Sequence, residues 1–259
     1  KPSIEEVLRG AFTEQTAHVY YASEMRYPIE GGYKSFLKKM AEETSIQTSS
    51  EVCSIHTESK KLTFSGSEEV SYDKIISTLP LPVLIPMLSN VPDEVKAAVE
   101  LLSWTSVDLV SIGFSKPDIP KYLWFYMYDE DILPARAYAP SLKAIDNVPE
   151  GCSSLQFEIY SSKHKSLNLH PEELIAHVIL KLVEMNICTR ADIMLTDHRK
   201  VEYGNVIFDH HHKTATQTVH NYLDSKGILY AGRFGEWGYL WSDQSLLSGK
   251  KAADCIFVA

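Results

Sequence analysis

Apolar and polar residues alternate at every second position through much of the first third of the chain. Between residues 45 and 79 this period of two predicts a meander of short strands. Three later segments also favour strands, and they are 106–114, 124–128 and 154–160. Because neighbouring side chains of a strand point to opposite faces, each predicted strand has one face for a core.

A second period, in which apolar residues recur three and four positions apart, predicts amphipathic helices. One of these helices follows Gly31-Gly32 and carries Phe36, Leu37 and Met40 on its apolar face. The other predicted helices span 2–12, 92–102, 172–185 and 214–223, with a last one beginning at Ser242 or Asp243. Strands and helices are interspersed, so we expect a mixed fold, α/β with α+β character.

The C-terminal segment 228–256 combines a short apolar strand, a glycine turn and a helix. Glycines stand at 232, 235 and 238, and Ser242 is a suitable N-cap residue. The free N–H groups and the dipole of a helix N-terminus favour a negatively charged ligand. This pattern therefore predicts an anion site, and the alternative is a buried strand–turn–helix whose aromatic residues serve packing.

Composition and charge narrow the class of protein. The chain has 259 residues and a net charge of −9 without a basic cluster, which argues against nucleic-acid binding. No stretch approaches the roughly 18 apolar residues of a membrane span. The four cysteines are widely spaced, and we expect buried free thiols in a reducing, cytoplasmic compartment.

Three adjacent histidines, at positions 210–212, raise the question of a metal site. Neighbouring residues of an extended strand point to opposite faces, so at most two of these side chains reach one ion. No further set of ligands at typical spacing accompanies Asp209. We therefore expect no metal and interpret the histidines as a solvated turn.

Four stretches resemble one superfamily of flavoproteins, which contains flavin amine oxidases, protoporphyrinogen oxidases and UDP-galactopyranose mutases. They are AGRFGEWGYLWSDQSLLSGKKAAD at 231–254, YPIEGGYKSFL at 27–37, SYDKIISTLP at 71–80 and ILPARAYAPSLKAIDNVPEGCSSLQFEIY at 132–160, which contains Arg136. The resemblance implies a partial FAD/NAD(P)-binding-like domain with an inserted mixed-sheet substrate domain. Residues 1–80 and 205–259 would form the cofactor-side segments, which we expect to pack together, and 81–204 the substrate domain.

The resemblance also implies site residues. On the flavin side it implies Gly31, Gly32, Gly232, Phe234, Gly235, Glu236, Trp237, Asp243 and Gln244. On the substrate side it implies Arg136, Arg233 and Tyr239. Homologous stretches often carry an aromatic residue at the position of Asn205, and Tyr203 is the candidate substitute. The alternative to a substrate-binding role for Arg136 is an ordinary exposed arginine near a strand end. The alternative for Arg233 is a structural ion pair with Glu236 or Asp243.

The resemblance implies the C-terminal part of an FAD-dependent oxidoreductase, with a small-molecule substrate. One alternative is a mutase-like isomerase whose substrate is a nucleotide sugar, and another is a non-enzymatic remnant that binds no FAD. The chain begins at Lys1 and contains no G-x-G-x-x-G motif, so we expect a fragment that holds FAD weakly or not at all. The residue pattern assigns no catalytic residue.

Overall fold

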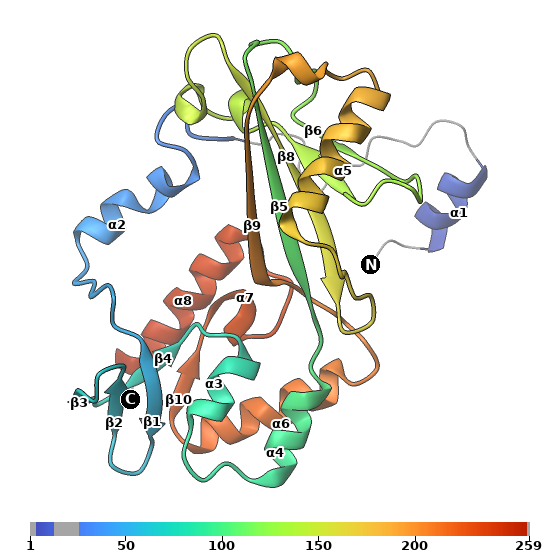
Figure 1. Cartoon of the computed structure of the whole chain (residues 1–259). Coiled ribbons are helices and arrows are strands. Elements are labelled where there is room, and N and C mark those ends of the chain that lie inside the picture. Colours follow the sequence, from blue (N-terminus) through green and yellow to red (C-terminus); the bar gives the residue numbers. More distant parts are fainter. Residues whose placement is uncertain (1–3, 13–25, 258–259) are drawn as a thin grey trace.

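The computed structural model describes residues 4–12 and 26–257, and it contains both helices and sheets (Figure 1). This confirms the predicted mixed fold. Half of the described strands belong to one five-stranded antiparallel sheet, and most of the remaining elements pack below it in the view of Figure 1. The candidate site lies between this sheet and the elements below it.

The five-stranded sheet has the strand order β6-β7-β8-β5-β9. Helix α5 (Pro171–Glu184) crosses one face of it (Figure 1). Alternate residues of the long central strands, such as Ile112 and Phe157, are buried against Leu174 and Val178 of this helix. In the part of the chain that the structure describes, the other face carries no such helix, and it presents more polar side chains, among them Arg136 and Glu158. The strands are β5 (Trp104–Phe114), β6 (Trp124–Tyr126), β7 (Arg136–Tyr138), β8 (Ser153–Ser162) and β9 (Ile193–Val206).

A second core lies beneath this sheet, where helices α3 (Leu81–Met87), α4 (Asp93–Leu101) and α6 (His212–Ser225) meet. Strand β4 (Ile75–Ser77) pairs there in parallel with β10 (Ile228–Tyr230), which is far away in the sequence. This pairing brings segments from the two ends of the chain together. Strands β1 (Val52–His56), β2 (Lys61–Phe64) and β3 (Glu69–Ser71) form a separate antiparallel sheet.

Short elements complete the described chain. Helix α7 (Gly232–Gly235) follows β10 and leads to the long helix α8 (Ser242–Phe257). The other elements are α1 (Ile4–Phe12), α2 (Lys38–Glu42) and the 3-10 helices η1 (Tyr33–Leu37), η2 (Pro140–Leu142), η3 (Ile145–Asn147) and η4 (Arg190–Asp192). Among the described residues no helix has the length and apolar character needed to cross a membrane.

Several sequence predictions are confirmed and others fail for physical reasons. The helices predicted over 92–102 and 172–185 are present as α4 and α5. Strand β9 was not predicted, because it is a sheet edge whose charged residues remain exposed and show no apolar alternation. Helix α3 was not predicted either, because it contains two prolines, of which Pro82 lies in the first turn, where a missing N–H costs little.

Two expectations about burial are wrong. Phe36, Leu37 and Met40 are exposed by 57%, 54% and 47%, so the predicted apolar helix face is not part of a core, although the Phe36 ring lies 5.5 Å from that of Tyr33. Of the four cysteines, all of which are free thiols, only Cys188 is buried. The other three were expected in the core because their spacing showed no ligand pattern, but spacing carries no information about burial.

The carboxylate of Asp192, near the end of the predicted substrate domain, is buried beside a lysine and a threonine. The Nζ atom of Lys116 lies 2.6 Å from Asp192 Oδ1, and Thr189 donates hydrogen bonds of 2.7 and 2.8 Å from its hydroxyl and its N–H to Oδ2. The Lys116 ammonium, followed by these Thr189 bonds, lowers the pKa of Asp192 to about 2. The ionised form is therefore stabilised by folding.

We expect the Asp192→Asn variant to be less stable than the parent at pH 6, and the difference to shrink with falling pH. The native pKa lies below that of an unfolded aspartate, about 3.9, so the extra stability is complete above pH 5 and is lost as the pH falls towards 2. Urea denaturation of both proteins at pH 6, 4 and 3 measures it. A difference that is the same at all three values would contradict this role.

Candidate functional site

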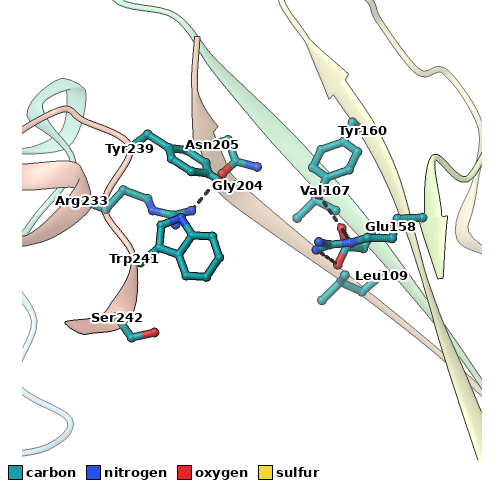
Figure 2. A pocket seen from close by; sticks show the side chains of 11 residues that line it. Val107, Leu109, Glu158, Tyr160, Gly204, Asn205, Arg233, Tyr239, Trp241 and Ser242 are labelled. Atoms are coloured by element: carbon teal, nitrogen blue, oxygen red, sulfur yellow. Dashed lines mark hydrogen bonds and ion pairs between the residues drawn. The ribbon is translucent and has the colours of Figure 1, made fainter. Parts of the chain in front are cut away.

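A cavity of about 440 Å³, here called cavity 1, lies between the uncovered face of the five-stranded sheet and the turn that joins α7 to α8. Figure 2 shows side chains from both sides pointing towards it. Residues of β5, β8 and β9 lie on one side, and residues of the turn lie on the other. Its lining consists of Val107, Leu109, Arg136, Glu158, Tyr160, Gly204, Asn205, Arg233, Tyr239, Trp241 and Ser242.

The sheet side of cavity 1 is organised around an ion pair. Arg136 and Glu158 are cross-strand neighbours on β7 and β8. The Arg136 guanidinium donates from Nε to Oε2 at 3.0 Å and from Nη2 to Oε1 at 2.5 Å, which is a bidentate contact. Tyr160 adds a hydrogen bond from its hydroxyl to Glu158. The buried Glu158 is thereby fully engaged, and the Arg136 side chain remains 39% exposed.

Protonation states follow from these contacts. Burial disfavours the charged form of Arg136, but the pairing with Glu158 outweighs it, so the pKa of Arg136 is raised and the guanidinium stays charged. Burial, followed by the hydrogen bond to Glu158, also raises the pKa of Tyr160, so that its phenol remains neutral. A bound ligand therefore meets one fixed cation on this side, beside a neutral phenol whose hydroxyl donates to Glu158.

The turn side of cavity 1 holds a second arginine. Arg233 donates from Nε and Nη2 to the carbonyl oxygen of Leu240, at 3.0 and 2.7 Å, and from Nη1 to Asn205 Oδ1 at 2.9 Å (Figure 2). Its guanidinium carbon lies 5.0 Å from the ring centre of Tyr239. Within the described part of the chain Arg233 has no ion pair with a carboxylate. The alternative of a structural ion pair with Glu236 or Asp243 is therefore not observed.

The charges that line cavity 1 favour an anion. Two guanidinium groups and one carboxylate leave one net positive charge in a protein whose net charge is −9. Ser242, the first residue of the 16-residue helix α8, lines the same cavity, so the positive end of the helix dipole lies beside it. Planar guanidinium groups and a helix N-terminus are both suited to phosphate oxygens.

Hydrogen bonds from α8 and α6 hold the turn in place. Gly232 has φ +77°, which favours glycine, and its N–H donates to Ser248 Oγ at 2.8 Å. The Ser248 hydroxyl in turn donates to Glu236. From α6, the Nε2 atoms of His212 and His220 lie 2.9 and 3.0 Å from the carbonyl oxygens of Trp237 and Gly235.

These contacts also revise our interpretation of the three histidines. His212 begins α6 and contacts the turn, so it is not part of a solvated loop. Among the residues that the structure describes, no group of three or more histidine, cysteine, aspartate or glutamate side chains is arranged to hold a metal ion.

Several residues predicted on the flavin side point towards the core. Trp237 is only 1% exposed, and a β-carbon at Gly235 would lie 3.0 Å from the carbonyl oxygen of Ser77. Phe234 packs edge-on against Tyr203 at a ring distance of 6.0 Å. Any contact of Trp237 or Gly235 with a cofactor must therefore come from the backbone.

Other predicted flavin-side residues lie on open surface. A β-carbon at Gly232 would meet no atom within 4 Å, so the backbone is accessible on that side. Asp243 and Gln244 are exposed in the first turn of α8, where Gln244 Oε1 accepts a 2.9 Å hydrogen bond from the N–H of Trp241. Glycine backbone and a free helix start together leave room for a planar ring system to approach.

Gly31 and Gly32 lie outside cavity 1, with φ values of +79° and +61°. Gly32 lines a second cavity of about 350 Å³, here called cavity 2. The neighbouring Tyr33 donates a hydrogen bond from its hydroxyl to Ser242, which lines cavity 1. This contact connects the Gly31-Gly32 segment to the start of α8.

Of the predicted substrate-side residues, the structure brings Arg136, Arg233 and Tyr239 together in cavity 1. Tyr203 does not line it, because its ring stacks on Trp104 at 4.9 Å. Its neighbours Gly204 and Asn205 take that place. The sequence interpretation named Ser242 as an N-cap residue in the predicted anion site, and it missed Val107, Leu109, Glu158, Tyr160 and Trp241.

Comparison with known proteins identifies the family. Residues 4–257 match the family described as flavin containing amine oxidoreductase, and the chain belongs to this family. A solved structure of reduced UDP-galactopyranose mutase is 27% identical, with a TM-score of 0.78, and the match covers 89% of this chain and 52% of that one.

Two further solved structures share the fold at lower identity. A putative protoporphyrinogen oxidase from Exiguobacterium sp. 255-15 is 16% identical with a TM-score of 0.68, over 87% of this chain and 51% of that chain. A redesigned putrescine oxidase is 14% identical with a TM-score of 0.61, over 88% and 53%. The chain thus spans about half the length of these proteins.

Proposed function

We propose that this chain supplies the substrate-binding sheet and the flavin-facing turn of an FAD-dependent enzyme, and that cavity 1 binds the diphosphate of a nucleotide sugar. One observation carries the proposal. Arg136 and Arg233 come from segments far apart in the sequence, and their side chains line the same cavity with the hydroxyl-bearing Tyr160 and Tyr239. Guanidinium and phenol groups are the donors that phosphate oxygens require.

The same charges argue against a cationic amine as the ligand of cavity 1. Glu158 is the only carboxylate among the described lining residues, and both of its oxygens accept hydrogen bonds from Arg136. An ammonium group would meet two guanidinium groups without a free counter-charge. Among the candidate substrates of the family, a phosphorylated one therefore matches this lining better.

The cofactor side of the proposal rests on the turn and on α8. The backbone around Gly232 and the first turn of α8, with Asp243 and Gln244, would hold the flavin, because this surface is open and lies next to cavity 1. Bound flavin supplies the redox chemistry of such enzymes. We also propose that residues 1–80 and 205–259 belong to the cofactor-binding part and 81–204 to the substrate-binding part, since β4 pairs with β10.

A calorimetric titration of the full chain with UDP, uridine and putrescine tests the proposal. We expect UDP to bind roughly 10- to 100-fold more tightly than uridine, because charge-assisted hydrogen bonds contribute about 1.5–3 kcal/mol. Putrescine, a dication, should show no measurable binding. Equal affinities for UDP and uridine, or preferential binding of putrescine, would contradict a diphosphate site.

A further inference from the structure

Cavity 2 contains a lysine whose ammonium group has no ion pair with any residue that the structure describes. The cavity lies beside β7, and Lys143 reaches into it next to the rings of Tyr138 and Tyr27. We propose that cavity 2 is a second ligand site, which binds an anionic group, a carboxylate or a phosphate, on the Lys143 ammonium. The complete lining is Tyr27, Pro28, Gly32, Tyr33, Tyr138, Pro140, Lys143, Ala144 and Asn147.

The position of the ammonium is well defined. Lys143 Nζ lies 4.1 Å from the ring centre of Tyr138 and 5.0 Å from that of Tyr27. These contacts hold the cation at the faces of two aromatic rings. The Lys143 ammonium makes no hydrogen bond or ion pair with any residue in the described part of the chain, so its three N–H donors are available to a ligand.

Two other partly buried cations of the protein are paired with carboxylates. Arg136 is paired with Glu158, and Lys181, whose side chain is 14% exposed, is paired with Asp131 and Glu184. Among the described residues, Lys143 has no ion pair with a carboxylate. Burial, and then the positive charge of Arg136, lower the pKa of Lys143, and the Glu158 carboxylate offsets only part of this effect. A bound anion would supply the missing counter-charge.

A purely structural lysine is the alternative explanation. Packing against two tyrosine rings needs only the apolar stem, and a methionine would fill that space without the cost of desolvating a charge. The cation–π contacts with the two rings offset only part of that cost. The absence of a described carboxylate partner, in a cavity large enough for a small ligand, favours a binding role.

The two cavities lie along the same strand. Tyr138, which contacts Lys143, is two residues from Arg136 of cavity 1, and alternate residues of a strand share a face about 7 Å apart. Anionic groups in cavities 1 and 2 would therefore be close enough to belong to one ligand. The inference about cavity 2 does not depend on the proposed function of cavity 1.

Competitive chemical labelling of the full chain tests the inference at the residue itself. Lysines are acetylated with acetic anhydride, and the rate at Lys143 is measured by peptide mass spectrometry with and without inorganic phosphate or formate. A bound anion slows labelling by the factor 1 + [L]/Kd, roughly tenfold at about ten times Kd. The exposed Lys121 is the control and should not change. Phosphate protection alone indicates a phosphate site, and formate protection alone a carboxylate site.

Variants distinguish anion binding in cavity 2 from anion binding in cavity 1 and from nonspecific effects of the added salt. In Arg233→Ala, which changes only cavity 1, we expect the protection of Lys143 to persist. We also expect phosphate or formate to raise the melting temperature of the Arg233→Ala protein by binding in cavity 2. Adding Lys143→Met to this protein should abolish that rise, whereas adding Lys143→Arg should retain it. Labelling of Lys143 that neither anion slows, at concentrations up to those that saturate cavity 1, would overturn the inference.

Discussion

Replacing Trp237 with alanine should lower the free energy of unfolding by about 3–5 kcal/mol, which is the typical cost of removing a fully buried tryptophan. Trp237 is 1% exposed and lies in the core between β10, α4 and α6. Its ring lies edge-on to Trp104 at 6.1 Å and 6.3 Å from Phe234. The truncation would leave a cavity directly beneath the turn that carries Arg233.

Urea denaturation of Trp237→Ala measures this loss, and Trp241→Ala is the matched control. Trp241 is the same residue type in the same turn, but it is 39% exposed and lines cavity 1. We expect its substitution to cost clearly less stability. Equal losses in both variants would show that Trp237 has no special role in the core, contrary to its burial.

The second large effect concerns the two arginines of cavity 1. Arg136→Ala and Arg233→Ala should each weaken UDP binding by about 1.5–3 kcal/mol, because each removes a charge-assisted contact to phosphate. Uridine binding should change little, since it lacks the diphosphate. Calorimetric titration of both ligands measures the difference, and Arg199→Ala, at an 80% exposed side chain of β9, is the control.

Stability and binding must be separated for these variants. Arg136→Ala leaves the buried Glu158 without its partner, and we expect a stability loss of about 2 kcal/mol, reduced from the value for fully buried pairs because Arg136 is partly exposed. Arg136→Lys keeps the charge but loses the bidentate geometry, so it should fold and still bind UDP weakly. Wild-type affinity for UDP in both alanine variants would rule out a diphosphate between them.

The sequence predicted the parts of this fold that local periodicity determines. Helices α4 and α5 have clear apolar faces, whereas β9 does not, because its burial depends on its position at the edge of a sheet. The pairing of β4 with β10 joins distant segments, and no local pattern encodes it. It was expected only because both segments resemble one family.

In the candidate site, too, some residues were predictable from the sequence, whereas others depend on contacts between distant segments. Arg136 and Arg233 were assigned by resemblance, but the partner of Arg136 was not, because it depends on the register between β7 and β8. A signal was available, since Gln156, Glu158 and Tyr160 alternate with apolar residues of one strand and therefore share a face. Trp237 shows the opposite case, because glycines surround it in the sequence and only its contact with the core reveals its burial.

A crystal structure of the full chain with bound UDP tests the central claim most directly, because it shows where the diphosphate lies. We predict phosphate oxygens within hydrogen-bond distance of both Arg136 and Arg233, in the cavity that Tyr160 and Tyr239 also line. A diphosphate bound elsewhere on the molecule, with both guanidinium groups retaining only their present protein contacts, would contradict the account.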